Sequence, residues 1–161
     1  MIGRGFCREM RRGEEAEVRA LLEACFDGPG ESRLVEALRK GRMMAGEMVL
    51  PGDDGIIGYY ALSWLQKPKG WLCLAPMAVR PDLQGQGLGR RMIGQLSEWA
   101  RLSKTNVVVL GEVGFYERAG FSAARAAGLS GPYPIEHTLL AGPGEDVPVQ
   151  GLVYPRPFET L

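Results

Sequence analysis

The sequence predicts a single α/β domain built on a mixed, largely antiparallel sheet with about four flanking helices. A length of 161 residues suits one hydrophobic core and leaves no room for a second. Leu, Ile, Val and Phe make up 40 residues, above the roughly 20% below which charged chains tend to stay disordered. Two helical patterns, three extended segments and a strand-helix-strand unit follow one another along the chain. We therefore treat residues 1–161 as one domain.

The first half of the chain predicts a short strand, two helices and a pair of strands. The short strand covers residues 6–10. Apolar residues at helical spacing predict helices over residues 14–26 and 31–40, each followed by a glycine that ends it. Residues 43–50 and 56–65 are typical of strands, and the Gly-, Pro- and Asp-rich turn between them predicts a hairpin.

A third apolar strand, residues 71–79, carries Pro76 in its interior. Proline lacks the N–H that a sheet ladder needs, so we expect a bulge there and a splay from the neighbouring strand. That neighbour is residues 106–110, whose consecutive valines are typical of a buried parallel strand. The sheet is therefore predicted to contain splayed central parallel strands. The helix between them, residues 88–104, has an apolar face of Leu88, Met92, Leu96, Trp99 and Ala100.

The rest of the chain predicts smaller elements. They are a short helix over residues 113–119 that Gly120 caps, a strand that begins at Phe121, and extended pieces at residues 139–140 and 147–154. Residues 154–158 are expected either to fold back on the domain or to form a homodimer contact.

The charge balance argues against one class of partner. Nineteen basic and nineteen acidic residues give a net charge of zero, which does not suit a protein that binds nucleic acid or an anionic membrane through a uniform field. The positive excess is local, because residues 80–104 hold five Arg and Lys against two acidic residues, a net charge of +3. That segment also contains the densest glycine cluster.

The sequence carries no signal that directs a protein to a membrane or an oxidising compartment. The longest apolar stretch, residues 71–79, is too short to span a bilayer, and the arginines near the N-terminus accompany no apolar block. Cys7, Cys25 and Cys73 are odd in number and lack the spacing of a disulfide framework or a zinc site. We expect a cytoplasmic protein without a metal.

Residues 84–89, Gln-Gly-Gln-Gly-Leu-Gly, form a glycine loop between a strand and a helix. A dinucleotide fingerprint would need glycine where Arg90 stands, and no Walker loop is present. The spacing that fits is [QR]-x-x-G-x-[GA]. Its glycines let backbone N–H groups approach a diphosphate, and the helix dipole adds about half a positive charge there. Arg90 and Arg91 oppose that dipole unless an anion offsets them.

A second motif, residues 116–121, reads Tyr-Glu-Arg-Ala-Gly-Phe and matches Y-x-x-x-G-F. With the glycine loop, in this order and separation, it resembles the GCN5-related N-acetyltransferase (GNAT) family. The resemblance covers residues 71–121, including the strand that enters the loop.

The resemblance implies a binding cleft for acetyl-CoA, the co-substrate, between the two splayed strands. Backbone groups of Met77, Ala78 and Val79 would hold the pantetheine arm. The loop and the start of the helix would hold the pyrophosphate through Gln84, Gly85, Gln86, Gly87, Leu88, Gly89, Arg90 and Arg91.

The resemblance also assigns the chemistry, which is direct attack of an amine on the thioester. Tyr116 matches the tyrosine that protonates the departing thiolate as general acid. The general base is unassigned, because residues 71–75 contain no carboxylate. A water relay, Glu112, Glu136 and His137 remain as candidates. Cys73 is not expected to act as a nucleophile, because an apolar strand raises a thiol pKa.

The function that follows is transfer of acetyl from acetyl-CoA to an amine of a small molecule or peptide. Two alternatives stay open. One is a non-catalytic acyl-CoA sensor, which the missing strand carboxylate allows. The other is an acetyltransferase that acts on aminoacyl-tRNA, which the zero net charge disfavours.

Overall fold

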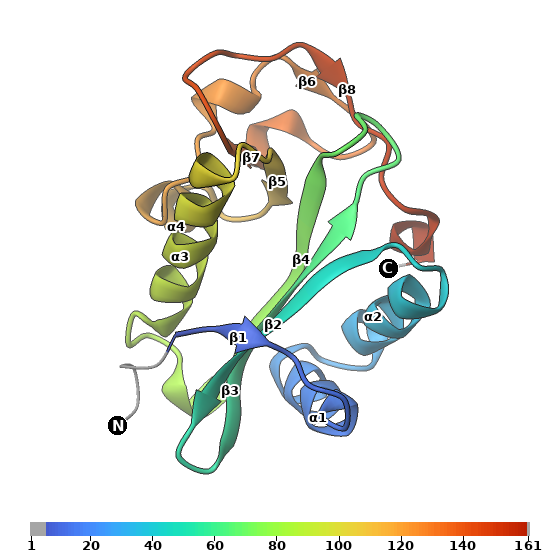
Figure 1. Cartoon of the computed structure of the whole chain (residues 1–161), viewed down its shortest axis with the longest axis vertical. Helices are drawn as coiled ribbons and strands as arrows, with labels where there is room; N and C mark the ends of the chain where they lie inside the picture. The colour runs from blue at the N-terminus through green and yellow to red at the C-terminus, as the bar shows by residue number, and fades with distance from the viewer. Residues whose placement is uncertain (1–5, 161) are drawn as a thin grey trace.

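A computed structural model describes residues 6–160 and contains a six-stranded mixed sheet flanked by helices (Figure 1). The strands lie in the order β1-β2-β3-β4-β5-β7. Their bounds are β1 Arg8–Glu9, β2 Met44–Gly52, β3 Gly55–Trp64, β4 Leu72–Val79, β5 Val107–Leu110 and β7 Thr138–Ala141. Only β4 and β5 pair in parallel within this sheet, so the predicted mixed, largely antiparallel α/β fold is confirmed.

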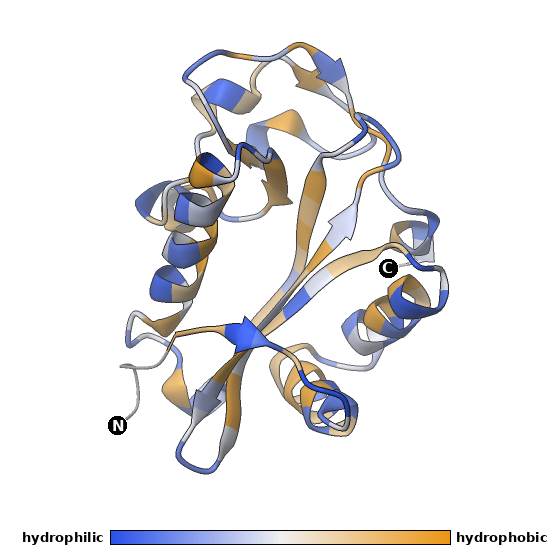
Figure 2. Ribbon diagram, viewed as in Figure 1, coloured by the Kyte–Doolittle hydropathy of each residue, from blue (hydrophilic) through white to orange (hydrophobic). Residues whose placement is uncertain are grey.

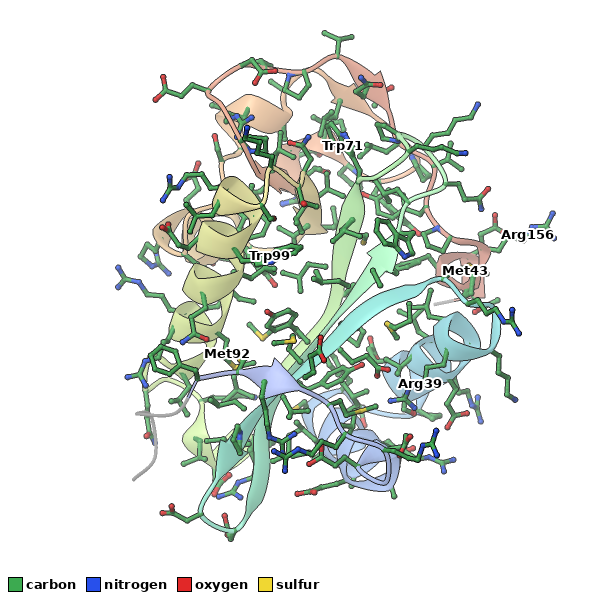
Figure 3. All side chains as sticks on the ribbon, in the orientation of Figure 1. Arg39, Met43, Trp71, Met92, Trp99 and Arg156 are labelled. Atoms are coloured by element: carbon green, nitrogen blue, oxygen red, sulfur yellow. The ribbon has the colours of Figure 1, made fainter. Side chains whose placement is uncertain are left out.

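Two pairs of helices cover the sheet (Figure 1). The first pair is α1 Glu15–Cys25 and α2 Gly30–Lys40, and the second is α3 Leu88–Leu102 and α4 Val113–Arg118. Their apolar stripes lie against the sheet, and Figure 2 shows hydrophobic residues along β4 and β5 between them. Met92 extends from α3 toward the sheet (Figure 3). Its sulfur occupies the space that a Cβ on Gly58 of β3 would need, so the helix packs closely on the strand at this glycine.

A polar cluster ties α2 to the sheet. The guanidinium of Arg39 donates to the carboxylate of Glu47 on β2, with Nη2 and Oε1 2.7 Å apart. The hydroxyl of Tyr59 on β3 donates to the same oxygen at 2.7 Å. Three elements distant in sequence are thereby fixed in one orientation.

The strand β4 has the predicted bulge and splay. Between Tyr60 and Leu62 of β3 the register against β4 slips by one residue, because Tyr60 pairs with Met77 and Leu62 with Leu74. The parallel pairing with β5 covers only Leu72 to Leu74 and ends just before Pro76. The missing N–H of proline thus marks the point where the two central strands part.

Two expectations about local structure are wrong. Trp99 does not belong to the buried face of α3, because it is 45% exposed. The buried stripe runs through Ile93 and Ala100 and leaves Trp99 at its border. Phe121 begins no strand, since the chain makes only one isolated bridge there, between Ser122 and Leu140.

The chain beyond β7 folds back onto the domain. A two-stranded sheet joins β6 Leu129–Ser130 to β8 Gln150–Gly151 in parallel. Further on, a 3-10 helix, Arg156–Thr160, lies beside α2 with Phe158 buried. No helix within residues 6–160 has the length and apolarity needed to cross a bilayer.

Candidate active site

A cavity of about 490 Å³ opens at the point where β4 leads into the glycine loop. The end of α1, the second half of β4, the start of α3 and the helix α4 enclose it. Its lining residues are Cys25, Phe26, Met77, Ala78, Val79, Leu83, Gln84, Gly85, Gly87, Leu88, Gly89, Arg90, Phe115 and Arg118. Nine of the predicted site residues therefore meet around one cavity, which we call the loop cavity.

The backbone of β4 presents free hydrogen-bonding groups to the splay. The N–H of Arg80 donates to the carbonyl of Ile57 at 2.8 Å, so Val79 and Gly58 form a pair without direct hydrogen bonds. In an antiparallel ladder the bonding direction alternates from residue to residue. The peptide groups of Met77 and Val79 therefore point away from β3, on the side where β5 no longer pairs.

The carbonyl of Val79 is already occupied by two donors. The amide Nε2 of Gln84 donates to it at 2.9 Å, and the thiol of Cys25 donates to it at 3.0 Å. A carbonyl oxygen has two lone pairs, so this group has no further capacity. The side chain of Gln84 thus anchors the loop to the strand. The backbone groups of the strand that remain free to bind a ligand are the N–H of Val79 and the N–H and carbonyl of Met77.

The loop backbone has the shape that the motif predicts. Gly85 and Gly87 have φ angles of +78° and +82°, and an added Cβ at either would meet no atom within 4 Å. The N–H groups of residues 85–90 donate to no acceptor within residues 6–160. At Gly89 a Cβ would lie 3.3 Å from the side chains of Met77 and Phe115, so glycine allows close packing there. The result is a row of unpaired donors at the start of a 15-residue helix.

Arginines surround the loop. Arg90 and Arg91 are exposed and form no ion pair within residues 6–160. An adjoining hollow of about 570 Å³ is lined by Gln86, Gly87, Arg90, Arg91, Gly94, Ser97, Arg118, Ala119 and Gly120. The remaining predicted loop residues, Gln86 and Arg91, lie in this hollow. The site combines unpaired N–H donors with three guanidinium groups, which suits a polyanion such as a phosphate chain.

Tyr116 lies on α4, one residue beyond the cavity-lining Phe115. The two rings meet edge to face with centroids 4.9 Å apart, and the ring of Phe121 packs on the other side at 5.8 Å. A Cβ on Gly111, just after β5, would collide with the Tyr116 ring. Burial raises the pKa of the Tyr116 phenol to about 12. Tyr116 is not among the residues that line the loop cavity, and its hydroxyl has no hydrogen-bond partner within residues 6–160.

The three side chains considered as general base lie elsewhere. Glu112 is the N-cap of α4, where its carboxylate accepts from the N–H of Phe115. Glu136 and His137 lie exposed on a 3-10 turn. None of the three lines the loop cavity. Burial raises the pKa of the Cys73 thiol to about 12, which agrees with an inert cysteine.

Five lining residues were not expected from the motifs: Cys25, Phe26, Leu83, Phe115 and Arg118. Phe115 and Arg118 flank the motif tyrosine and are three positions apart, so one face of a helix presents both. This helical spacing beside the motif tyrosine could have been read from the sequence. Cys25 and Phe26 come from the end of α1, and no local pattern links them to the loop.

Within residues 6–160 no group of three or more His, Cys, Asp and Glu side chains is arranged to hold a metal ion. The charged lining of the loop cavity consists of Arg90 and Arg118.

Comparison with known proteins gives a consistent result. Residues 46–123 match the sequence model of the acetyltransferase (GNAT) domain. The chain is 34% identical over 110 residues to the uncharacterized N-acetyltransferase YhbS of Escherichia coli K12. That alignment covers 65% of this chain and 66% of YhbS, slightly under two thirds of the relative's length.

Solved structures extend the likeness to nearly the whole chain. The crystal structure of YhbS from E. coli in complex with CoA matches with a TM-score of 0.81 at 25% identity, over 97% of this chain and 92% of that one. A GNAT family acetyltransferase from Brucella melitensis in complex with acetyl-CoA matches with a TM-score of 0.77 at 27% identity, over 94% and 96% of the two chains.

Proposed function

The chain belongs to the GNAT family of acetyltransferases, and on that basis we propose that it transfers acetyl from acetyl-CoA to an amine of a small molecule or peptide. One observation carries the proposal. The unpaired N–H groups of residues 85–90 continue into the free N–H groups of Met77 and Val79 and the free carbonyl of Met77. This spatial order of donors and acceptors suits a ligand in which a phosphate chain is followed by an amide-bearing arm.

Each part of the site has its own task in binding. The N–H groups of residues 85–90 and the guanidinium groups of Arg90 and Arg91 would hold the diphosphate. Met77 and the N–H of Val79 would pair with the pantetheine arm as a further strand would. Arg118, which lines both hollows, would contact a phosphate from the side of α4.

Acetyl-CoA supplies the thioester whose acyl group goes to the amine. The phenol of Tyr116 would donate its proton to the departing sulfur as general acid. At neutral pH the phenol is protonated, because burial keeps its pKa near 12. Within the described residues the loop cavity has no side-chain base, so we propose that water removes the proton of the amine.

The test is a steady-state assay of thiol release at saturating acetyl-CoA with a panel of primary amines, with the acetylated product identified by mass spectrometry. We expect release that depends on the amine and a product heavier by one acetyl group. Binding of acetyl-CoA without any amine-dependent release would reject the transferase. It would favour an acyl-CoA sensor, which the absence of a side-chain base from the cavity lining also suits.

A further inference from the structure

A second cavity, of about 460 Å³, lies along the same strand as the loop cavity. Its lining residues are Cys73, Leu74, Ala75, Leu110, Tyr133, Tyr154, Phe158 and Glu159. Residues 73–75 of β4 line this cavity and residues 77–79 line the loop cavity, with Pro76 between them. Ala75 and Met77 are two residues apart, about 7 Å along a strand. The two cavities therefore lie along neighbouring stretches of β4, one before and one after the bulge where β4 and β5 part.

We infer that this second cavity holds the acceptor, and that the acceptor is a small primary amine on an aromatic or aliphatic body without a nearby anionic group. The inference rests on the proposed transferase function and adds the class of substrate to it. A group bound along residues 77–79 would end near Pro76, where a ligand of the second cavity could reach it.

An aromatic wall sets the shape of this cavity. The rings of Tyr133 and Tyr154 meet edge to face with centroids 4.9 Å apart, and Tyr154 lies 5.7 Å from Phe158. The lining also includes the apolar residues of β4 and Leu110, which is 42% exposed. A volume of about 460 Å³ lies within the usual range of small-ligand pockets, about 300–1,000 Å³. An apolar body therefore fits this space better than an extended polar chain.

The wall is fixed to the domain. The amide of Gln66 donates to the carbonyl of Tyr154 at 3.2 Å. Lys67 and Val153 form a bridge in which the N–H of Val153 donates to the carbonyl of Lys67 at 3.0 Å and the N–H of Lys67 donates back at 3.3 Å. Phe158 is only 7% exposed within the cluster that includes α2. The returning C-terminal chain therefore forms an ordered side of the cavity.

The charge of the cavity selects for an amine that carries no acid. Glu159 is the charged residue of the lining, which contains no Lys, Arg or His. Arg156, on the same 3-10 turn, points away from the molecule (Figure 3). A protonated amine would be attracted by the Glu159 carboxylate. A substrate carboxylate or phosphate would be desolvated there without a cation to pair with, which is unfavourable.

The experiment compares amines that differ by one carboxylate. Isoamylamine, 2-phenylethylamine and tyramine are each assayed for thiol release against leucine, phenylalanine and tyrosine, the amino acids with the same body. We expect kcat/KM to favour at least one amine over its amino acid by roughly 10-fold or more, the penalty of leaving a buried polar group unpaired. Coenzyme A binding, measured by calorimetry in parallel, shows whether the loop cavity is intact.

Two variants test the named residues. Glu159→Gln should raise KM for the amine about two- to fivefold, as expected for an exposed ion pair, and leave coenzyme A affinity unchanged. The matched control is Glu136→Gln, an exposed carboxylate that lines neither cavity. Tyr154→Leu, checked by thermal melting, should raise KM by removing part of the wall. Tyr154→Phe, made in the native protein, keeps the ring and should have the native KM.

The outcomes distinguish a wrong substrate class from a wrong transferase function. If coenzyme A binds and only amino acids or other acidic amines are acetylated, the substrate class is wrong and the transferase function stands. If Glu159→Gln and Glu136→Gln have the same KM, Glu159 does not bind the amine and the inference fails. If acetyl-CoA binds and no amine of any class is acetylated, both the inference and the proposed function fail.

Discussion

Tyr116 illustrates what the surroundings of one side chain do to its chemistry. Phe115 and Phe121 enclose its ring, and desolvation raises the pKa of the phenol to about 12. The group is therefore a proton donor and not a base across the physiological pH range. In the proposed mechanism only its hydroxyl contributes to the chemical step.

We expect Tyr116→Phe to lower kcat about 10²- to 10⁴-fold with little change in cofactor Kd, because the ring is kept and the proton is lost. The measurement is thiol release at saturating acetyl-CoA. Tyr60→Phe, a buried tyrosine that lines neither cavity, is the control for loss of a hydroxyl. A Tyr116→Phe enzyme that is equally stable and within about threefold of native kcat would remove Tyr116 from the mechanism.

Glu14 gives a prediction about pH. Its carboxylate accepts from the Arg8 guanidinium at 2.9 and 2.7 Å and from the Arg11 N–H at 2.6 Å, which lowers its pKa from 4.5 to about 2. A depressed pKa in the folded state stabilises the fold above the unfolded value, and this contribution is lost as the pH falls from about 4.5 toward 2.

The melting temperature of the native protein should therefore decrease over that pH range more steeply than that of Glu14→Gln, which has no carboxylate to protonate. Glu117→Gln, at an exposed position on α4, controls for loss of an acidic residue elsewhere. Parallel acid profiles for the native protein and Glu14→Gln would contradict this account.

At the scale of elements, the glycine loop and the start of α3 together form the proposed phosphate site. The φ of +82° at Gly87 disfavours any side chain, and its Cβ direction opens to empty space. Gly70, in the turn between β3 and β4, has a φ of +84° and equally open space. The same substitution at the two positions thus carries a similar backbone cost, of order 1 kcal/mol.

We predict that Gly87→Asp abolishes measurable coenzyme A binding while Gly70→Asp retains it, although both lose a similar amount of stability. Only at Gly87 would the new carboxylate meet a diphosphate. Isothermal titration with coenzyme A, together with thermal melts of both variants, makes the comparison. Equal affinities of the two variants for coenzyme A would show that the loop does not bind the phosphates.

The elements themselves follow from local sequence, with one instructive failure. Helices α1, α2 and α3 begin and end within two residues of the ranges that apolar spacing and glycine predict. The strand expected from Phe121 does not form, because the chain turns into a 3-10 helix, Ala124–Ala126, and leaves the free edge of β7 after one residue. Ser122 bonds to Leu140 in a single bridge instead.

At the scale of the molecule, cofactor binding should stabilise the whole fold, because the loop cavity joins α1, β4, α3 and α4. A ligand at a hundredfold excess over its Kd adds about 2.7 kcal/mol to the free energy of unfolding. For a chain of this size that corresponds to a rise in Tm of about 5–11 °C. Differential scanning fluorimetry with coenzyme A measures it, with adenine as a control that lacks the phosphates. An unchanged Tm at millimolar coenzyme A would contradict the family assignment of the site.

The sequence by itself determined the loop, the motif tyrosine and the break at Pro76, because glycine backbone freedom, helical spacing and the missing proline N–H are local properties. Tertiary structure alone decided which groups remain available. The Val79 carbonyl is occupied by Cys25, 54 residues away, and Glu112 is used as a helix cap. The second cavity is formed by β4 and the returning residues 154–159. Such contacts join segments that lie far apart in the chain, and no local pattern encodes which of them will meet.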